Sequence, residues 1–322
     1  MVAKGLPKIR AGMGDVDAPV VEAWSDDDYR RATSLGTILS PDGKADRAGV
    51  PALEPEALRE CYRTMLRIRA LGDRARVRSD GQLADEPGDA APGTHGVEAA
   101  IVGAVAALEA DDIVVPGRRE TVAALWRGHS VAALAAGAAI PRALGVLPGS
   151  AHGATQLPHA TGIAWAMKMQ ADGQARDGRA GGGKVVLAFL DRAATSAEDF
   201  HAGLNFAGVF RVPAVFVCIN DAPAGSTPVE TVSETLAVKA LAYGIAGVRV
   251  DGHDLFAVHA ATRAAADRAC KGEGATLIEA VVAETGDPLE RVRTWLASQN
   301  MLDAAAEATL RREVEAELAA LP

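Results

Sequence analysis

The sequence predicts an α/β fold in which a parallel sheet is covered by helices on both faces, and two observations carry this prediction. Four short runs rich in apolar residues occur at 184–190, 213–220, 247–252 and 275–282. Most are almost continuously apolar, which is typical of strands buried on both faces. Helical patterns separate the runs, and strands alternating with helices are the order of a parallel sheet.

The rest of the chain after residue 54 is predicted to be mainly helical. One helix is expected to begin near Pro55, because proline suits a first helical turn and apolar residues recur at helical spacing after it. A flexible loop is expected at 171–184, and 1–54, rich in Pro, Gly and Asp, is expected to form an extended N-terminal arm before one domain at 55–322. Further helices are predicted at 97–112, 121–140, 197–210, 229–243, 254–271 and 304–321.

Composition excludes several functional classes. The formal net charge of −9 argues against nucleic acid or an anionic membrane as the main partner. The three cysteines, Cys61, Cys218 and Cys270, are too far apart for a zinc motif and are typical of a reducing cytoplasm. No apolar run reaches membrane length, so a cytoplasmic protein is expected.

Two acids follow neighbouring apolar runs. Asp191 comes after the run at 184–190, and Asp221 comes after the run at 213–220. Because ligands of parallel sheets collect at the carboxyl ends of strands, both carboxylates could face one point and hold a hard cation such as Mg²⁺. Either acid could instead cap the helix that follows, and the two residues alone favour this simpler role.

The segment ATSAEDFHAGLNFAGVFRVPAVFVCIND, which ends at Asp221, resembles the thiamine diphosphate motif of α subunits of 2-oxo acid dehydrogenases. These subunits belong to the decarboxylating first components of the pyruvate and branched-chain complexes. The resemblance covers most of the chain and includes GVEAAIVGAVAAL and DPLERVRTWLASQNML, the latter being closer to the branched-chain type. It implies the thiamine diphosphate-binding fold, thiamine diphosphate and Mg²⁺ as cofactors, an α₂β₂ heterotetramer with a β-type subunit, and an acyltransferase core as a further partner.

The resemblance transfers the family's site unevenly. The family motif opens with Gly-acid-Gly-Ala, whereas this chain has Leu190, Asp191, Arg192 and Ala193, so the acid remains and both glycines are replaced. The resemblance implies a metal site formed by Asp191, Asp221 and the backbone carbonyl of Pro223. The cofactor-binding residues that it implies are Arg118, Arg119, Gly153, Asp191, Arg192, Ala193 and Asn220.

Two family features are missing from the sequence. The family carries an active-site histidine in a loop after the strand that matches 275–282, but only 283–286 lie between that strand and Asp287. The segment before Gly153 is also shorter than its family counterpart. No catalytic residue is therefore assigned, and His152 and His159 are the only histidines worth testing.

These departures predict an α-type subunit that has lost catalysis and acts in assembly with a β-type subunit or with itself. The small-residue stretches 96–108 and 162–169 are expected to suit close packing between subunits. Arg192 is expected to turn inward and pair with Asp191 or Asp221. Three alternatives remain: an active enzyme with a remodelled site, a new anion site for another phosphorylated ligand, and weak binding of thiamine diphosphate that is held partly by the β subunit.

Overall fold

The structure is a computed structural model that describes residues 25–46, 48–78, 94–150, 153–176, 183–221, 231–282 and 286–320. Within these ranges the chain builds a five-stranded sheet in the order β1-β2-β3-β5-β4, and every pair of neighbouring strands is parallel. The strands are β1 (Ile113–Val115), β2 (Val186–Asp191), β3 (Ala214–Asn220), β4 (Ala246–Asp251) and β5 (Thr276–Val281).

The predicted fold class is confirmed. Strands β2 and β3 are hydrogen-bonded neighbours, with Val186 opposite Ala214 and Asp191 opposite Ile219. Asp191 therefore ends β2, and Asp221 directly follows the end of β3, so both acids lie at the same edge of the sheet. Strand β1 was missed by the sequence analysis because three residues are too few to form a recognisable run.

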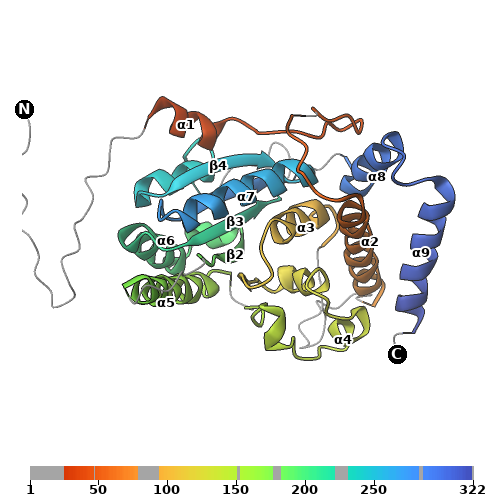
Figure 1. Ribbon diagram of the computed structural model, residues 1–322, viewed down its shortest axis with the longest axis horizontal. Helices are drawn as coiled ribbons and strands as arrows, with labels where there is room; N and C mark the ends of the chain where they lie inside the picture. The colour runs from red at the N-terminus through yellow and green to blue at the C-terminus, as the bar shows by residue number, and fades with distance from the viewer. Residues whose placement is uncertain are drawn as a thin grey trace, which may run out of the picture.

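The helices cover both faces of this sheet (Figure 1). They are α1 (Asp26–Thr33), α2 (Pro55–Arg78), α3 (Glu98–Ala106), α4 (Val131–Ala135), α5 (Gln156–Arg176), α6 (Glu198–Phe210), α7 (Leu255–Cys270), α8 (Pro288–Ser298) and α9 (Ala304–Ala319). Short 3₁₀ helices are η1 (Arg119–Leu125), η2 (Arg142–Leu144), η3 (Ala193–Ser196) and η4 (Ala237–Tyr243).

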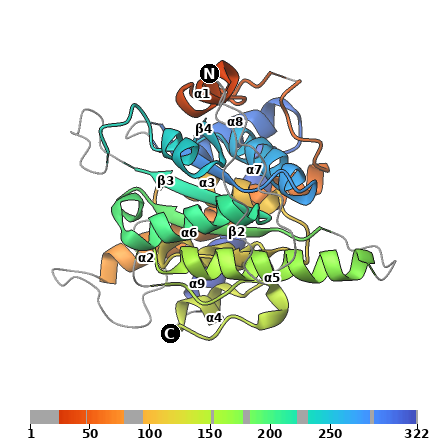
Figure 2. The same cartoon turned by 90° about the vertical axis from the view of Figure 1, so that its left-hand side faces the viewer.

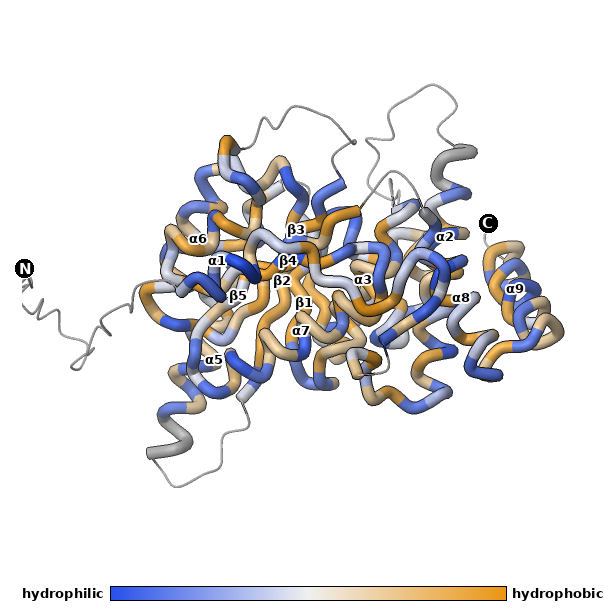
Figure 3. The backbone as a smooth tube through the Cα atoms, turned by 90° about the horizontal axis from the view of Figure 1, so that it is seen from above, coloured by the Kyte–Doolittle hydropathy of each residue, from blue (hydrophilic) through white to orange (hydrophobic). Residues whose placement is uncertain are grey.

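Strand β2 shows how the core divides into two layers. Its Leu187 and Phe189 side chains join the apolar cluster that contains α2, α3 and α7 residues. Its Val186, Ala188 and Leu190 side chains point to the opposite face and join the cluster with α5 and α6. Figure 2 shows these two helices lying side by side over the sheet, and the hydrophobic colouring of the central strands is visible in Figure 3.

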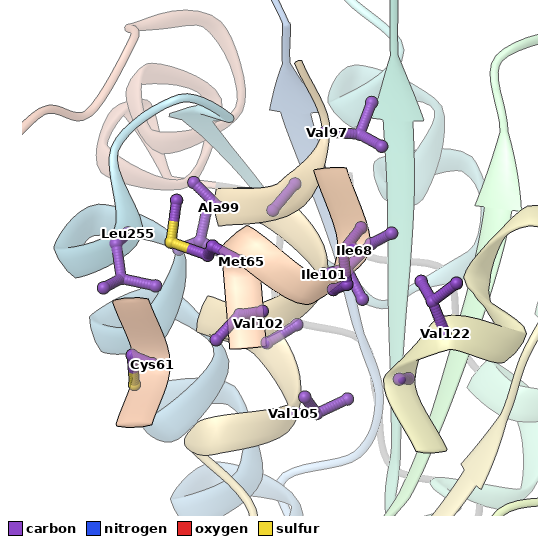
Figure 4. Packing of buried hydrophobic residues seen from close by; sticks show 14 of the residues in the cluster. Cys61, Met65, Ile68, Val97, Ala99, Ile101, Val102, Val105, Val122 and Leu255 are labelled. Carbon is purple, nitrogen blue, oxygen red and sulfur yellow. The ribbon is translucent and has the colours of Figure 1, made fainter. Parts of the chain in front are cut away.

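Helix α3 packs inside its own chain. All of its residues from Glu98 to Val105 are buried, and a Cβ atom added to Gly103 would lie 2.8 Å from the carbonyl oxygen of Leu255 on α7. The side chains of α2, α3 and α7 meet in this layer (Figure 4). The expectation that the stretch 96–108 packs between subunits is therefore wrong, because its small residues serve the contact with α7.

Several predicted helices are shorter than expected or of another type. The helix expected at 97–112 ends at Ala106. In the turn that follows, the Asp112 carboxylate accepts a hydrogen bond from the Glu109 N–H at 2.9 Å, just before β1 begins. The stretch 121–140 holds η1 and α4 rather than one helix, and they are separated at Gly128, which has φ +93°. Helix α5 continues to Arg176 into the expected loop, whose residues 177–182 lie outside the described ranges.

The described part of the expected arm lies against the sheet. Residues 1–24 fall outside the described ranges, while α1 packs on β4 and Gly36 forms a parallel bridge with Val250. The buried Asp254 carboxylate accepts hydrogen bonds from the N–H groups of Ile38 and Leu39 at 2.5 and 2.6 Å. Among the described helices, none combines the length and apolar character needed to cross a membrane.

Candidate functional site

A cavity of about 370 Å³ opens at the carboxyl ends of β2 and β3. Its walls come from the turn that enters η1, the start of α5 and the turn between β2 and η3. Seven of the predicted site residues line it, namely Arg118, Arg119, Gly153, Asp191, Arg192, Ala193 and Asp221. The structure thus brings together residues that are more than 100 positions apart in the chain.

The turn after β2 is an ordinary right-handed one. Arg192 has φ −61° and ψ −38°, a conformation open to any residue, so the backbone here does not require glycine. The Asp191 carboxylate accepts a hydrogen bond from the Ala194 N–H at 2.7 Å, which caps η3. Asp191 therefore performs the capping role that the sequence analysis left open, while its side chain still borders the cavity.

Arg119 connects the two sides of the cavity. Its Nε donates to Glu120 Oε1 at 2.9 Å, and its Nη1 donates to Asp221 Oδ2 at 2.8 Å. Burial alone would lower the pKa of the Arg119 guanidinium, but the carboxylates of Glu120 and Asp221 outweigh it, so the pKa is raised and the group stays charged. The third nitrogen, Nη2, is buried and has no hydrogen-bond partner among the residues that the structure describes.

Arg192 lies beside the same acid. Its Nε is 3.9 Å from Asp221 Oδ1, within ion-pair distance but beyond hydrogen-bond reach for these two atoms. Asp221 therefore stands between two guanidinium groups, of which Arg119 makes the direct hydrogen bond. The sequence analysis expected Arg192 to turn toward an acid, but it did not anticipate that Arg119 would hold Asp221.

A divalent cation at this site would lie between the carboxylates of Asp191 and Asp221. Mg²⁺ requires several oxygen ligands in near-octahedral geometry. One Asp221 oxygen is hydrogen-bonded to Arg119, one Asp191 oxygen caps η3, and a cation between the acids would lie next to two guanidinium groups. Across the described ranges no group of three or more His, Cys, Asp or Glu residues is placed to hold a metal, and Pro223 lies outside them. As they lie, these side chains do not fit Mg²⁺.

Asn220 does not line the cavity, although it was predicted to bind the cofactor. Its amide nitrogen donates to Glu279 Oε1 at 2.8 Å. Glu279 is only 1% exposed, and its other oxygen accepts the Ala237 N–H at 2.9 Å. The sequence analysis missed Glu279, although an acid inside the apolar run at 275–282 was a signal that this side chain must have buried partners.

Gln156, at the start of α5, was also missed. Its Nε2 donates to the carbonyl oxygens of Gly153 and Phe189 at 3.2 and 2.9 Å. The side chain is 4% exposed and borders the cavity, and its Oε1 has no hydrogen-bond partner among the described residues. Gln156 and Arg119, which both border the cavity, therefore each hold one buried polar atom that no described residue satisfies.

Of the two histidines singled out from the sequence, only His159 can be placed, and it is not among the residues that border the cavity. His159 is exposed on α5, and His152 lies outside the described residues.

The known proteins that resemble this chain match it across the whole site. The family described as "Dehydrogenase E1 component" matches residues 90–283, which include every residue that lines the cavity. The pyruvate dehydrogenase E1 component subunit alpha of Bacillus cereus is 35% identical over 265 residues, covering 77% of this chain and 66% of that protein, just under two thirds of its length. The Bacillus subtilis protein of that name is 32% identical over 321 residues, covering 87% of this chain and 81% of its own. A Staphylococcus aureus protein of the same name is 33% identical over 290 residues, covering 84% of this chain and 73% of its own length.

Proposed function

We propose a function from the premise that this chain belongs to the dehydrogenase E1 component family, among the α subunits of 2-oxo acid dehydrogenases. That family depends on thiamine diphosphate, generally with a metal ion, and its α subunits work with a β subunit in the pyruvate dehydrogenase complex. The proposed role of this chain is structural: it keeps the fold and the capacity to assemble, but it does not hold thiamine diphosphate and Mg²⁺ as the family does.

The ion pair between Arg119 and Asp221 carries this proposal. The resemblance assigns Asp221 to the metal and Arg119 to the diphosphate, yet the two side chains bind each other at 2.8 Å. A charge-assisted hydrogen bond in a partly buried site is among the stronger polar contacts, and Arg119 is only 15% exposed. Metal binding would have to break this contact and place a cation beside Arg119 and Arg192.

The short connection after β5 also favours lost catalysis. Strand β5 ends at Val281 and α8 begins at Pro288, so six residues join them. The family resemblance places the active-site histidine in a loop at this point. Without that loop, proton transfer at a bound cofactor would lack the side chain that the family uses.

The assembly role rests on an exposed apolar surface, which we name the α5/α6 aromatic face. It consists of Trp165, Met169, Phe206, Val209 and Phe210. Phe210 stacks on Trp165 with ring centroids 4.7 Å apart and on Phe206 at 5.8 Å. Met169, Phe206 and Val209 are 55%, 52% and 59% exposed, and such a gathering of large apolar side chains favours a protein partner. The proposed partner is a β-type subunit or a second copy of this chain, with the acyltransferase core as a further one.

The assembly proposal is tested by Phe206→Asp, which places a charge on the face at a half-exposed position. We expect the variant to dissociate in light-scattering measurements, with a β-type subunit present, while its melting temperature changes little. Val232→Asp is the matched control, because Val232 is a fully exposed valine outside α5 and α6. A wild-type chain that stays monomeric at micromolar concentration with the β-type subunit would contradict the proposal.

The loss of cofactor binding is tested by calorimetric titration of the chain, alone and with a β-type subunit. We expect no Mg²⁺-dependent binding of thiamine diphosphate and no decarboxylation of 2-oxo acids. One alternative function is favoured by a specific observation: Asp191, Asp221 and Arg119 still border one cavity, as an active E1 subunit would need. Mg²⁺-dependent binding together with turnover would establish that alternative.

A further inference from the structure

Among the described residues that line the cavity, positive and negative side chains are equal in number. Arg118, Arg119 and Arg192 supply three guanidinium groups, while Glu120, Asp191 and Asp221 supply three carboxylates. The Asp191 carboxylate caps η3, and Glu120 and Asp221 both accept hydrogen bonds from Arg119. With Asp221 removed from this set, the wall carries one excess positive charge.

Asp221 differs from the other two acids because its carboxylate can move away from the cavity into solvent. Its side chain is 41% exposed, whereas that of Glu120 is 4% exposed. It also makes no contribution to the capping of η3, which Asp191 provides. Moving the Asp221 carboxylate into solvent would therefore expose Nη1 of Arg119 to the cavity beside the already unpartnered Nη2.

We propose that the cavity is a metal-independent phosphate site in which the Asp221 carboxylate occupies the place of the anion, so that a phosphorylated ligand binds by displacing it. The inference rests on the proposed function, because it takes the pair between Arg119 and Asp221 as the resting state. Both Nη atoms of Arg119 then face one oxyanion, which is the forked geometry in which arginine binds phosphate.

The cavity also indicates what the phosphate is attached to. A volume of about 370 Å³ is in the range of small-molecule sites and exceeds what a bare phosphate ion needs. The buried Oε1 of Gln156 requires a hydrogen-bond donor, which the fully ionised phosphate group of a phosphomonoester does not offer. An organic phosphate that carries a hydroxyl group satisfies both Arg119 and Gln156. The ligand class is therefore a small hydroxylated phosphomonoester.

The test is a calorimetric titration with EDTA present, using inorganic phosphate and glycerol phosphate as probes. Asp221→Asn removes the competing charge, so we expect it to bind both probes about tenfold more tightly than the unmodified chain, which is about 1.4 kcal/mol. Asp221→Ala provides the same test if the Asn variant folds poorly. Asp267→Asn is the matched control, because Asp267 is an exposed acid paired with Arg263 Nε at 3.2 Å, away from the cavity, and it should leave binding unchanged.

Two further variants test Arg119 as the hydrogen-bond donor and Gln156 as the acceptor. Arg119→Lys keeps the charge but loses the fork, and we expect it to abolish binding of both probes. Gln156→Leu should weaken glycerol phosphate, whose hydroxyl groups lie away from the phosphate, more than inorganic phosphate, a split that a merely structural role would not produce.

The outcomes separate the two proposals. Equal or weaker binding by both Asp221 variants overturns the inference, and so does a lack of phosphate binding by every variant, while the proposed function would survive either result. Binding that needs Mg²⁺, with thiamine diphosphate preferred over glycerol phosphate, overturns the proposed function as well.

Discussion

Two regions of the molecule are formed by residues of opposite character. One is the contact between α3 and α7, and the other is the cavity at the end of β2. In the first, small and apolar residues bring two helices so close that Gly103 has no room for a side chain. In the second, six charged side chains border one cavity. The apolar contact follows the residue pattern expected from the family resemblance, whereas the cavity departs from it at Leu190 and Arg192. Under the proposed function, the difference means that a fold held by apolar packing persists while its ionic site changes.

Strand β2 leads from the apolar core to the cavity, and its last two residues, Leu190 and Asp191, lie where the two meet. Leu190 is 1% exposed and packs in the α5/α6 layer, and it borders the cavity together with Asp191. The family resemblance places glycine at position 190 so that the backbone can approach a diphosphate. In this chain the position belongs to the core, and its side chain contributes to stability.

The largest expected effect is therefore that of Leu190→Gly. Removing a buried leucine from a strand should lower the free energy of unfolding by roughly 3–5 kcal/mol. Arg192→Gly, on the other side of Asp191, should cost about 1 kcal/mol or less, because Arg192 is partly exposed in a turn. Urea denaturation of the two variants measures the contrast. Equal losses of unfolding free energy in the two variants would show that position 190 is not a core position.

A smaller effect is expected from acid on the α3 and α7 side. His259 on α7 is 8% exposed, and burial, assisted by Arg263, lowers its pKa to about 4. The unfolded chain has a histidine pKa near 6.5 and therefore binds more protons between pH 6.5 and 4. The stability contributed by neutral His259 is fully present above this window and is lost as the pH falls through it, by up to roughly 3 kcal/mol.

Replacing this histidine isolates its share of the acid response. The free energy of unfolding of His259→Leu should fall less steeply with acid than that of the unmodified chain. His201→Gln, at an exposed position on α6, is the control variant. Parallel profiles for His259→Leu and the unmodified chain would contradict a lowered pKa.

The sequence predicted the strands far better than the ion pairs. Continuous apolar runs identified β2, β3 and β5, and their spacing with one intervening helix placed Asp191 and Asp221 at one edge of the sheet. Local pattern could not predict that Arg119 would hold Asp221, because that contact joins residues 102 positions apart and depends on where η1 meets the end of β3.

The segments that became 3₁₀ helices were misread for a related reason. The residues of η1 and η4 carry helical apolar spacing, but their geometry is set by packing on the sheet and by the left-handed Gly244 that ends η4. Asn220 likewise was assigned to the cofactor, whereas its amide donates a hydrogen bond to Glu279 on the adjacent strand.

The most direct measurement of the central claim is anomalous diffraction from crystals grown with thiamine diphosphate and Mn²⁺, which accepts the same oxygen ligands as Mg²⁺. The account predicts no anomalous peak between Asp191 and Asp221, with Nη1 of Arg119 still within hydrogen-bond distance of Asp221. A manganese peak coordinated by both carboxylates, with Arg119 turned to a bound diphosphate, would contradict it.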